Sequence, residues 1–328
     1  MIKKNQTMIT NFILLGFSGA PVFQQLLFAL FLLIYITTIM GNISIILAYR
    51  LTSSLHTPMY FFLANLSFLE ICYISTSVPK MLSNFLATHK TISFSGCVIQ
   101  MYCFLLLGGT ECYLLAVMAY DRYIAICQPL LYGTKMKKKA CIQLVAVSWT
   151  GGAINSLVHT ILTFRLPFCR DNRINNFFCD IPPVMQLACT STMINEIVLL
   201  VASGCVIVSS FILTIISYTH IITTILNIKT TSGRKKAFST CTSHLIVVTL
   251  FYGSAIFMYF RPKSSYSMDQ DRVTSALYAF VAPLLNPFIY SLRNGDVKAA
   301  VRKIIKQTIS LQKDYVKEKR IREQSHKL

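Results

Sequence analysis

The chain has 328 residues, of which 54% are hydrophobic and only 13% are charged. This composition excludes an ordinary soluble globular protein, in which about a quarter of the residues are charged. The formal net charge of +19 raises the alternative of a nucleic-acid-binding protein. The basic residues, however, cluster in loops and in the C-terminal tail between long uncharged runs, so the anionic cytoplasmic leaflet is the better counter-charge. We therefore expect an integral membrane protein with no nucleic-acid partner.

The first segment, residues 1–22, is short and polar, and we expect it outside the cell. Asn5 begins an Asn-Gln-Thr triplet, which would accept an N-linked glycan on that side. The apolar run that follows, about 22–49, is too long for the core of a signal peptide. It predicts a retained spanning helix.

Six further apolar runs follow, each long enough to cross the roughly 30 Å hydrocarbon core as a helix. The seven expected spans are residues 22–49, 58–86, 95–127, 140–164, 195–226, 237–260 and 272–293. An odd number puts the termini on opposite sides, with the N-terminus outside and the C-terminus inside. The fold class is therefore an all-α integral membrane protein with a seven-helix bundle at 23–293. Basic residues favour this orientation only through the cytoplasmic segment 294–328.

Cysteines provide a separate indication of sidedness. Of eleven, seven fall within or at the ends of the expected helices, where a buried thiol is the usual state. The other four lie on the side assigned to the outside: Cys97, Cys169, Cys179 and Cys189. An even set in an oxidising compartment predicts two disulfides. Sequence alone leaves three pairings open.

Isolated polar residues interrupt several spans. Glu70, Glu111 and Asn286 have apolar neighbours and should face the bundle interior. The two carboxylates could share protons or bind a cation, or they could be protonated and hydrogen-bonded. Asp121 and Arg122 lie in the stretch MAYDRYIAIC at a span end, where the alternative to a functional pair is an arginine that extends to the headgroups.

The last span ends in PLLNPFIYSLRN, residues 283–294. Pro283 and Pro287 each remove a backbone hydrogen bond, which favours a kink, and Asn286 is placed to bond a freed carbonyl. A helix weakened in this way can move. The pattern Asn-Pro-x-x-Tyr at this position is much more specific than Asp-Arg-Tyr alone.

These motifs together resemble a known family. The chain is similar to the rhodopsin-like (class A) G-protein-coupled receptors and, within them, to the olfactory (odorant) receptors. The matching stretches are GN at 41–42, LHTPMYFFLANLSFLE at 55–70, MAYDRYIAIC at 118–127, SY at 217–218, KAFSTCTSHL at 236–245 and PLLNPFIYSLRN at 283–294.

The resemblance implies roles for individual residues. Asp121 would hold Arg122 at rest, and Arg122 would be released to meet the C-terminal helix of the G protein. The implied coupling and switch set is Asp121, Arg122, Tyr123, Tyr218, His244, Asn286, Pro287 and Tyr290. The implied cation cluster, for a sodium ion, is Glu70, Glu111 and Asn286, although the family often has Asp where this chain has Glu70. No other metal and no cofactor are expected.

The resemblance also implies disulfide pairing and the nature of the C-terminus. It pairs Cys97 with Cys179 and Cys169 with Cys189. Residues 293–328 contain no cysteine for palmitoylation. Residues 296–306 instead predict a short amphipathic eighth helix on the membrane lipid. The charged segment beyond residue 313 predicts a disordered basic tail.

The expected ligand site is a cavity within the bundle, below the long loop before the fifth span. Its residues would be Phe104, Leu105, Gly108, Gly109, Ser203, Ile207, Tyr252, Ala255 and Tyr259. Amine receptors of the wider family carry an Asp where this chain has Phe104, and without it a cationic ligand would be left unpaired. We expect a small, neutral, mostly apolar volatile, oriented by one hydroxyl of Tyr259, Tyr252 or Ser203.

The expected function is odorant reception at the plasma membrane, in olfactory neuron cilia by resemblance, through a stimulatory G protein and cyclic AMP. Because no phosphate loop, hydrolase triad or zinc spacing occurs in the sequence, we expect no enzymatic activity. Two alternatives are a secondary transporter and an intramembrane enzyme. The first would show paired repeats with broken helices, and the second would need another catalytic group beside Glu70 or Glu111.

Overall fold

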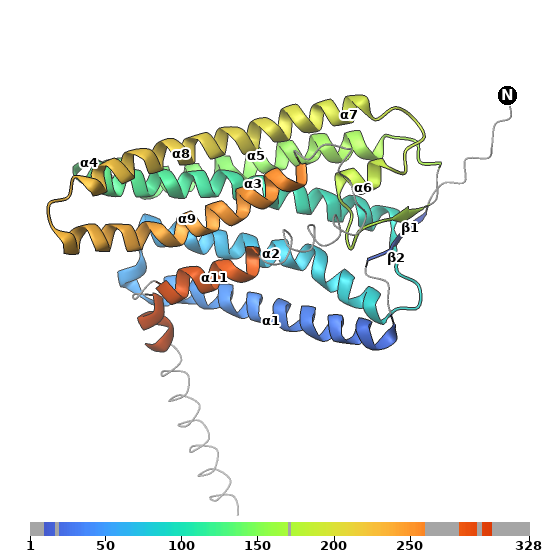
Figure 1. Ribbon diagram of the computed structural model, residues 1–328, viewed down its shortest axis with the longest axis horizontal. Helices are drawn as coiled ribbons and strands as arrows, with labels where there is room; N and C mark the ends of the chain where they lie inside the picture. Colours follow the sequence, from blue (N-terminus) through green and yellow to red (C-terminus); the bar gives the residue numbers. More distant parts are fainter. Residues whose placement is uncertain (1–9, 17–19, 170–171, 260–281, 294–296, 304–328) are drawn as a thin grey trace, which may run out of the picture.

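A computed structural model describes residues 10–16, 20–169, 172–259, 282–293 and 297–303. The described chain is a bundle of long helices that run roughly along one direction (Figure 1). Its principal helices are α1 (Pro21–Leu51), α2 (Pro58–Leu86), α3 (Phe94–Cys127), α5 (Lys138–Phe164), α8 (Gly204–Leu226), α9 (Thr231–Tyr259) and α11 (Ala282–Arg293). Helix α3 contacts α2, α5, α8 and α9, so it forms the centre of the bundle.

Five helices of the described chain are long and apolar enough to cross a membrane. They are α1, α2, α3, α5 and the continuous segment made of α7 (Met193–Val198), η2 (Leu199–Ser203) and α8. Helix α9 contains a shorter apolar stretch, Cys241–Ile256. The seventh expected span is described only from Ala282, and its first part, 272–281, lies outside the described residues.

The helix boundaries follow from local chemistry. Helix α2 starts at residue 58, as the sequence predicts, with Pro58 at a first-turn position where its missing N–H has no helical partner to lose. Helix α3 is capped by Ser93, whose hydroxyl accepts from the Gly96 N–H at 3.1 Å. Helix α9 begins at Thr231 rather than at 237, because the basic stretch assigned to a loop is itself helical.

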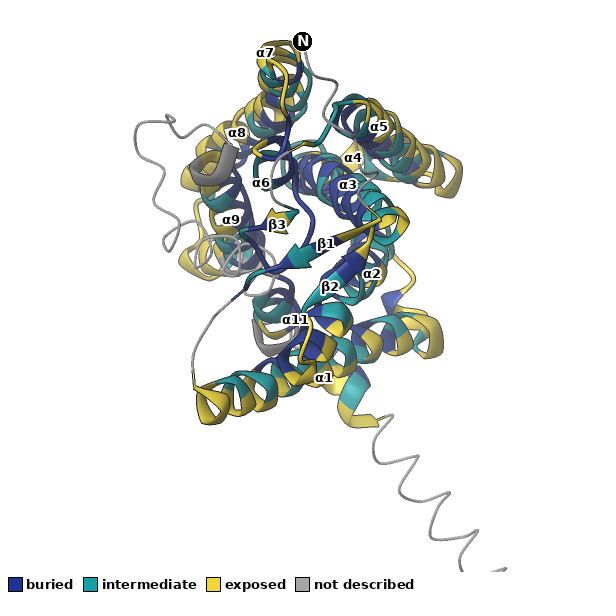
Figure 2. Cartoon of the chain, turned by 90° about the vertical axis from the view of Figure 1, so that its right-hand side faces the viewer, coloured by how far each residue is buried: buried dark blue, intermediate teal, exposed yellow. Residues whose placement is uncertain are grey.

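The buried residues of the helices face the interior of the bundle and the exposed residues face outward (Figure 2). Large hydrophobic side chains such as Leu33, Val147 and Leu213 are more than half exposed. Exposed apolar surface on this scale is what a lipid environment requires of a helical bundle. The fold is therefore that of a membrane helical bundle.

One end of the bundle is covered by a small sheet, and we call it the sheet end. Strand β1 (Asn11–Leu14) pairs antiparallel with β2 (Thr91–Ser93) and parallel with β3 (Arg173–Ile174). Figure 2 shows the three strands lying across the ends of the helices. We call the opposite end, where α3 finishes after Arg122, the Arg122 end.

The sheet corrects the interpretation of 1–22 as a plain polar segment. Phe12 of β1 is fully buried and its ring packs against Phe94 and Phe168, with ring centroids 5.9 Å apart in both pairs. Strands of two to four residues contain too few positions to show a period of two, so the sequence pattern did not reveal them.

Two disulfides fix the loop between α5 and α7. The structure joins Cys97 of α3 to Cys179 and Cys169 to Cys189, the same pairs that the family resemblance implies. The first bond closes a separation of 82 residues, which greatly restricts the unfolded chain. Gln100 reinforces it, because its Oε1 accepts from the Cys179 N–H at 2.9 Å.

The short helix α6 (Ile181–Met185) lies in this loop and begins at a buried carboxyl group. Asp180 accepts from the Ile181 N–H at 2.8 Å through Oδ1, and its side chain is 1% exposed. Desolvation by burial raises the pKa of this carboxyl from 3.8 to about 6, and the hydrogen bond only partly offsets the effect. The folded state is therefore stabilised when Asp180 is protonated.

Asp180→Asn is expected to be at least as stable as the wild type at neutral pH. The amide keeps an oxygen acceptor for Ile181 and removes a buried charge. Since the folded pKa is raised, the stability that protonation gives the wild type is complete below about pH 4 and is lost as the pH rises through about 6. Thermal unfolding in detergent should show the variant's advantage at pH 7.5 shrinking at pH 4.5. An advantage that does not change with pH would contradict this assignment.

Helix α8 is preceded by an irregular turn. Residues Leu199–Ser203 form a π-helical segment, in which the hydrogen bonds span one more residue than in an α-helix. Such segments are frequent at functional sites. Ser203, at its end, is one of the expected ligand residues.

The Arg122 end contains a short helix, α4 (Pro129–Lys135), and a single turn, η1 (Ser53–Leu55). Residues 297–303 are also helical, with Val297 and Ala300 buried on one face. The rest of the expected eighth helix, 304–306, and the tail to 328 lie outside the described residues.

Candidate functional site

A small cavity lies between α3, α5, η2, α8 and α9, toward the sheet end. Its volume is about 40 Å³. The described residues that line it are Phe104, Leu105, Gly108, Gly109, Cys112, Asn155, Ser203, Val206, Ile207 and Ala255. Seven of these belong to the nine-residue ligand set expected from the sequence. None of the described lining residues is charged.

The cavity has a polar side formed by α5 and η2. The Ser203 hydroxyl and His159 Nε2 are hydrogen-bonded at 2.9 Å, and His159 is 2% exposed. Asn155 of α5 lines the cavity next to this pair. A ligand in the cavity would therefore meet an amide and a hydroxyl on one side and apolar side chains on the others.

Two expected ligand residues differ from this group. Tyr252 does not line the cavity among the described residues: its hydroxyl donates to the carbonyl oxygen of Cys112 at 3.0 Å, and its side chain is 1% exposed. It supports the lining from behind, since Cys112 is itself a lining residue. The side chain of Tyr259 lies outside the described residues.

The wall between α3 and α5 depends on close helix packing. A Cβ atom added at Gly109 would lie 3.3 Å from Cα of Gly152, so the two helices approach through small residues. The Ser156 hydroxyl donates to the Tyr102 carbonyl at 2.5 Å along the same interface. This contact fixes the side of the cavity that carries Gly108 and Gly109.

A polar cluster lies deeper in the bundle, between α2, α3 and α11. Asn286 donates to Glu70 Oε1, and both side chains are 1% exposed. Glu111 is 2% exposed. Three oxygens of these side chains lack a hydrogen-bond partner in the described chain: Glu70 Oε2, Glu111 Oε1 and Asn286 Oδ1.

This donor set consists of oxygens alone, and oxygen is the ligand that hard cations prefer. The residues present therefore fit the small cation that the sequence suggested, and they would fit protonated carboxyl groups as well.

Most of the expected switch residues gather at the Arg122 end, whereas Asn286 lies in the deeper polar cluster. Asp121 is bonded to α4: the Tyr132 hydroxyl donates to its Oδ1 at 3.0 Å. Asp121 and Arg122 form no direct ion pair among the residues that the structure describes, but the charge of Arg122 acts on Asp121 electrostatically. The Tyr123 hydroxyl accepts from Gln128 Nε2 at 2.8 Å.

Arg122 itself is 7% exposed. It lies close enough to Tyr218, His244 and Tyr290 to act on each of them electrostatically. The Tyr218 hydroxyl and His244 Nδ1 are hydrogen-bonded at 2.8 Å, which links α8 to α9. Pro287 packs against α1, where a Cβ atom at Gly41 would lie 3.0 Å from its ring.

Comparison with known proteins agrees with this arrangement. A family model described as "Olfactory receptor" matches residues 31–308. Mouse olfactory receptor 5AP2 is 52% identical over 302 residues, which cover 92% of this chain and 95% of the relative. Rat olfactory receptor 1f45 is 50% identical over 305 residues (93% and 97%), and human olfactory receptor 5AP2 is 50% identical over 302 residues (92% and 96%).

The chain belongs to the olfactory receptor family. Membership implies odorant sensing through G-protein signalling. The family is one of receptors and is not an enzyme class. The family and the apolar helices together indicate a multi-pass membrane protein. The family resemblance seen in the sequence motifs is thus confirmed.

Sequence reasoning missed several residues of this olfactory receptor. Asn155 and His159 lie in the uncharged fourth span, and their polarity was a usable signal that they face the interior. Tyr132 gave no such signal, because it lies in a loop whose helical turn was not expected. Gln100 likewise becomes informative only when Cys179 is placed beside it.

Proposed function

We propose that this olfactory receptor binds a small, neutral, mostly apolar volatile in the cavity lined by Phe104, Ile207 and Ala255. The observation that supports this ligand class most directly is the lining, in which no described residue carries a charge. A charged ligand would lose its hydration without gaining a counter-charge. Asn155 and Ser203 offer hydrogen bonds to one polar group of the ligand, such as a hydroxyl or a carbonyl.

The size of the cavity connects binding to activation. A volume of about 40 Å³ is far below the roughly 300–1,000 Å³ of pockets that hold drug-sized ligands. A volatile of several carbon atoms therefore requires α8 or α9 to move away from α3. A ligand that binds the wider bundle more tightly shifts the population toward it.

The wider bundle would act on the G protein at the Arg122 end. Movement of α9 against α8 changes the Tyr218–His244 bond and uncovers Arg122, which then meets the C-terminal helix of a stimulatory G protein. Tyr123, Asn286, Pro287 and Tyr290 complete the switch set. The signal would be a rise in cyclic AMP.

The orientation follows from the same proposal. Seven helices at 23–293 cross the plasma membrane, residues 1–22 face outward with a glycan on Asn5, and 294–328 face the cytoplasm with a surface helix and a basic tail. The cellular site would be the cilia of olfactory neurons. The cluster of Glu70, Glu111 and Asn286 would hold a sodium ion at rest and favour the narrow bundle.

Ala255→Leu tests the cavity. The substitution adds three carbon atoms to a residue that is 1% exposed and lines the cavity. The potency of an activating volatile is expected to fall by at least about tenfold, a typical effect of a methylene-sized change in an apolar pocket. The measurement is a cyclic-AMP reporter dose–response in cells that express an olfactory stimulatory G protein, at matched surface expression.

The control is Val208→Ala on the outer face of α8, where Val208 is 46% exposed. The potency of the volatile at this variant should stay within about twofold of its potency at the wild type, as expected for a surface substitution. The proposal would be contradicted if the volatile were equally potent at Ala255→Leu and at the wild type. Activation by charged volatiles alone would contradict it as well.

A further inference from the structure

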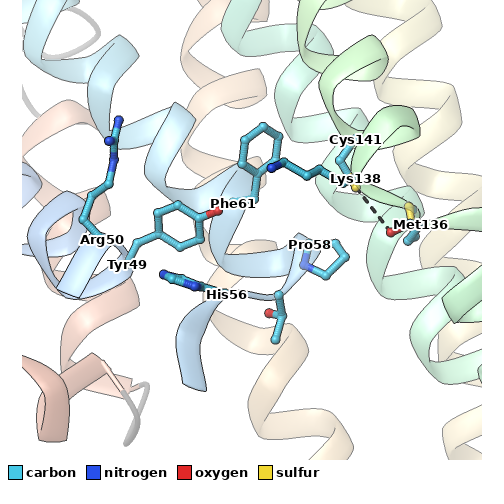
Figure 3. Close-up of a pocket in the computed structure, with 9 residues that line it drawn as sticks. Tyr49, Arg50, His56, Pro58, Phe61, Met136, Lys138 and Cys141 are labelled. Carbon is cyan, nitrogen blue, oxygen red and sulfur yellow. Dashed lines mark hydrogen bonds between the residues drawn. The ribbon is translucent and has the colours of Figure 1, made fainter. Parts of the chain in front are cut away.

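A second and larger cavity lies at the Arg122 end, between α1, α2 and the start of α5 (Figure 3). Its volume is about 730 Å³, within the range of pockets that bind sizeable ligands. The described residues that line it are Tyr49, Arg50, His56, Thr57, Pro58, Phe61, Met136, Lys138 and Cys141. None of them belongs to the odorant, switch or cation sets.

The lining is basic and aromatic. Arg50, His56 and Lys138 come from three different segments, and all three side chains are exposed. No Asp or Glu occurs among the described lining residues. In Figure 3, Lys138 extends toward the rings of Phe61 and Tyr49, and Arg50 lies beyond Tyr49 at the outer edge. The cavity is therefore suited to an anion.

The backbone adds to this preference. Helix α2 starts at Pro58 and helix α5 at Lys138, and both of these residues line the cavity. Neither N-cap residue, Thr57 or Lys137, makes a side-chain capping bond, and the first turns contain no acidic residue. The first residues of two helices thus line one cavity, and the positive end of a helix favours negative charge.

Apolar surface continues from the cavity along the bundle. Leu47 precedes Arg50 by three residues, and Ile142 follows Lys138 by four, so each lies one helical turn further in on the same face. Leu47 is 42% exposed and Ile142 is 48% exposed. An occupant with an anionic head and an apolar tail would satisfy both parts of this surface.

We propose that this cavity binds the phosphorylated headgroup of an anionic phospholipid of the cytoplasmic leaflet, a phosphoinositide, with its acyl chains along α1 and α5. Basic pockets between spanning helices on the cytoplasmic side bind such headgroups. The proposal depends on the orientation given in the proposed function, which enzymatic removal of a glycan from Asn5 tests separately. Lipid binding is measured without an odorant, so the two proposals can fail independently.

The test uses the full-length receptor in neutral phosphatidylcholine nanodiscs and a fluorescent short-chain phosphatidylinositol bisphosphate as the probe. Lys138→Gln and His56→Gln are compared with Lys139→Gln, a matched control one residue from Lys138 that is exposed and is absent from the described lining. Loss of Lys138 is expected to weaken binding about fivefold, as for one basic residue near an anionic surface. His56→Gln should weaken binding, and Lys139→Gln should leave it unchanged.

Three results would overturn the proposal. Equal weakening by Lys138→Gln and Lys139→Gln would indicate diffuse electrostatic attraction. Binding of soluble inositol trisphosphate as tight as that of the lipid would indicate a free phosphate ligand. Unchanged lipid binding with loss of G-protein activation in Lys138→Gln would assign the surface to the G protein.

Discussion

Gly152→Ala is expected to remove most of the folded receptor from the cell surface. A Cβ atom at this position would lie 2.6 Å from the carbonyl oxygen of Leu106 and 2.8 Å from the backbone nitrogen of Thr110. These are backbone atoms of α3, so they cannot turn aside as a flexible side chain would. The added Cβ atom would also clash with the Thr110 hydroxyl, which donates to the Leu106 carbonyl at 2.7 Å. Separating α3 from α5 should cost about 3 kcal/mol or more, the upper end of overpacking effects.

The measurement is surface expression by flow cytometry together with thermal unfolding of the solubilised receptor. Gly253→Ala is the control, because a Cβ atom there meets nothing within 4 Å. Its expression should equal that of wild type. Normal expression and stability of Gly152→Ala would show that α3 and α5 are further apart than the structure places them.

Arg122→Gln is expected to abolish the odorant response while the receptor still reaches the surface. Arg122 is buried at the point where α3, α8, α9 and α11 meet, and its local carboxylate, Asp121, is hydrogen-bonded to Tyr132. We propose that its guanidinium group is the charge that meets the G protein. Loss of charged hydrogen bonds, worth about 1.5–3 kcal/mol each, should lower coupling by at least about tenfold.

Cyclic-AMP output at matched surface expression measures this effect. Arg165→Gln removes the same side chain from an exposed position at the sheet end and should respond like wild type. A full response of Arg122→Gln would remove Arg122 from the coupling site.

Five long helices, α1, α2, α3, α5 and the segment from α7 to α8, could be predicted from sequence because lipid excludes charge, so the gaps between charged residues mark them. The expected 58–86 agrees with α2 exactly. Helix α9 begins at Thr231, before the span expected from 237, because a helix can continue into water, where Arg234 and Lys235 are well tolerated. Hydropathy locates the part of a helix that lies in the membrane, and it does not locate the end of the helix.

Most of the cavity lining was expected through the family resemblance, including Ser203 on its polar side, but Asn155 and His159 were not. Tyr252 and Ala255 were both expected to face the ligand, and they are three residues apart on α9, a spacing that puts two side chains on one face. The structure separates them, because the longer tyrosine reaches past the lining to the Cys112 carbonyl. The His159–Ser203 bond joins residues 44 positions apart, and no local pattern reports such a distant partner.

The π-helical segment at Leu199–Ser203 changes how positions along its helix can be compared. One extra residue in a turn rotates everything before it by about 100° relative to a regular α-helix. If helix faces are assigned by counting back from Tyr218 with about 3.6 residues per turn, the residues that precede 199, in α7, are therefore placed on the wrong face. Mutational scans of this helix need two reference positions, one on each side of the π-helical segment. Deletion of a single residue within the segment would turn Glu196 and its neighbours toward a different helix.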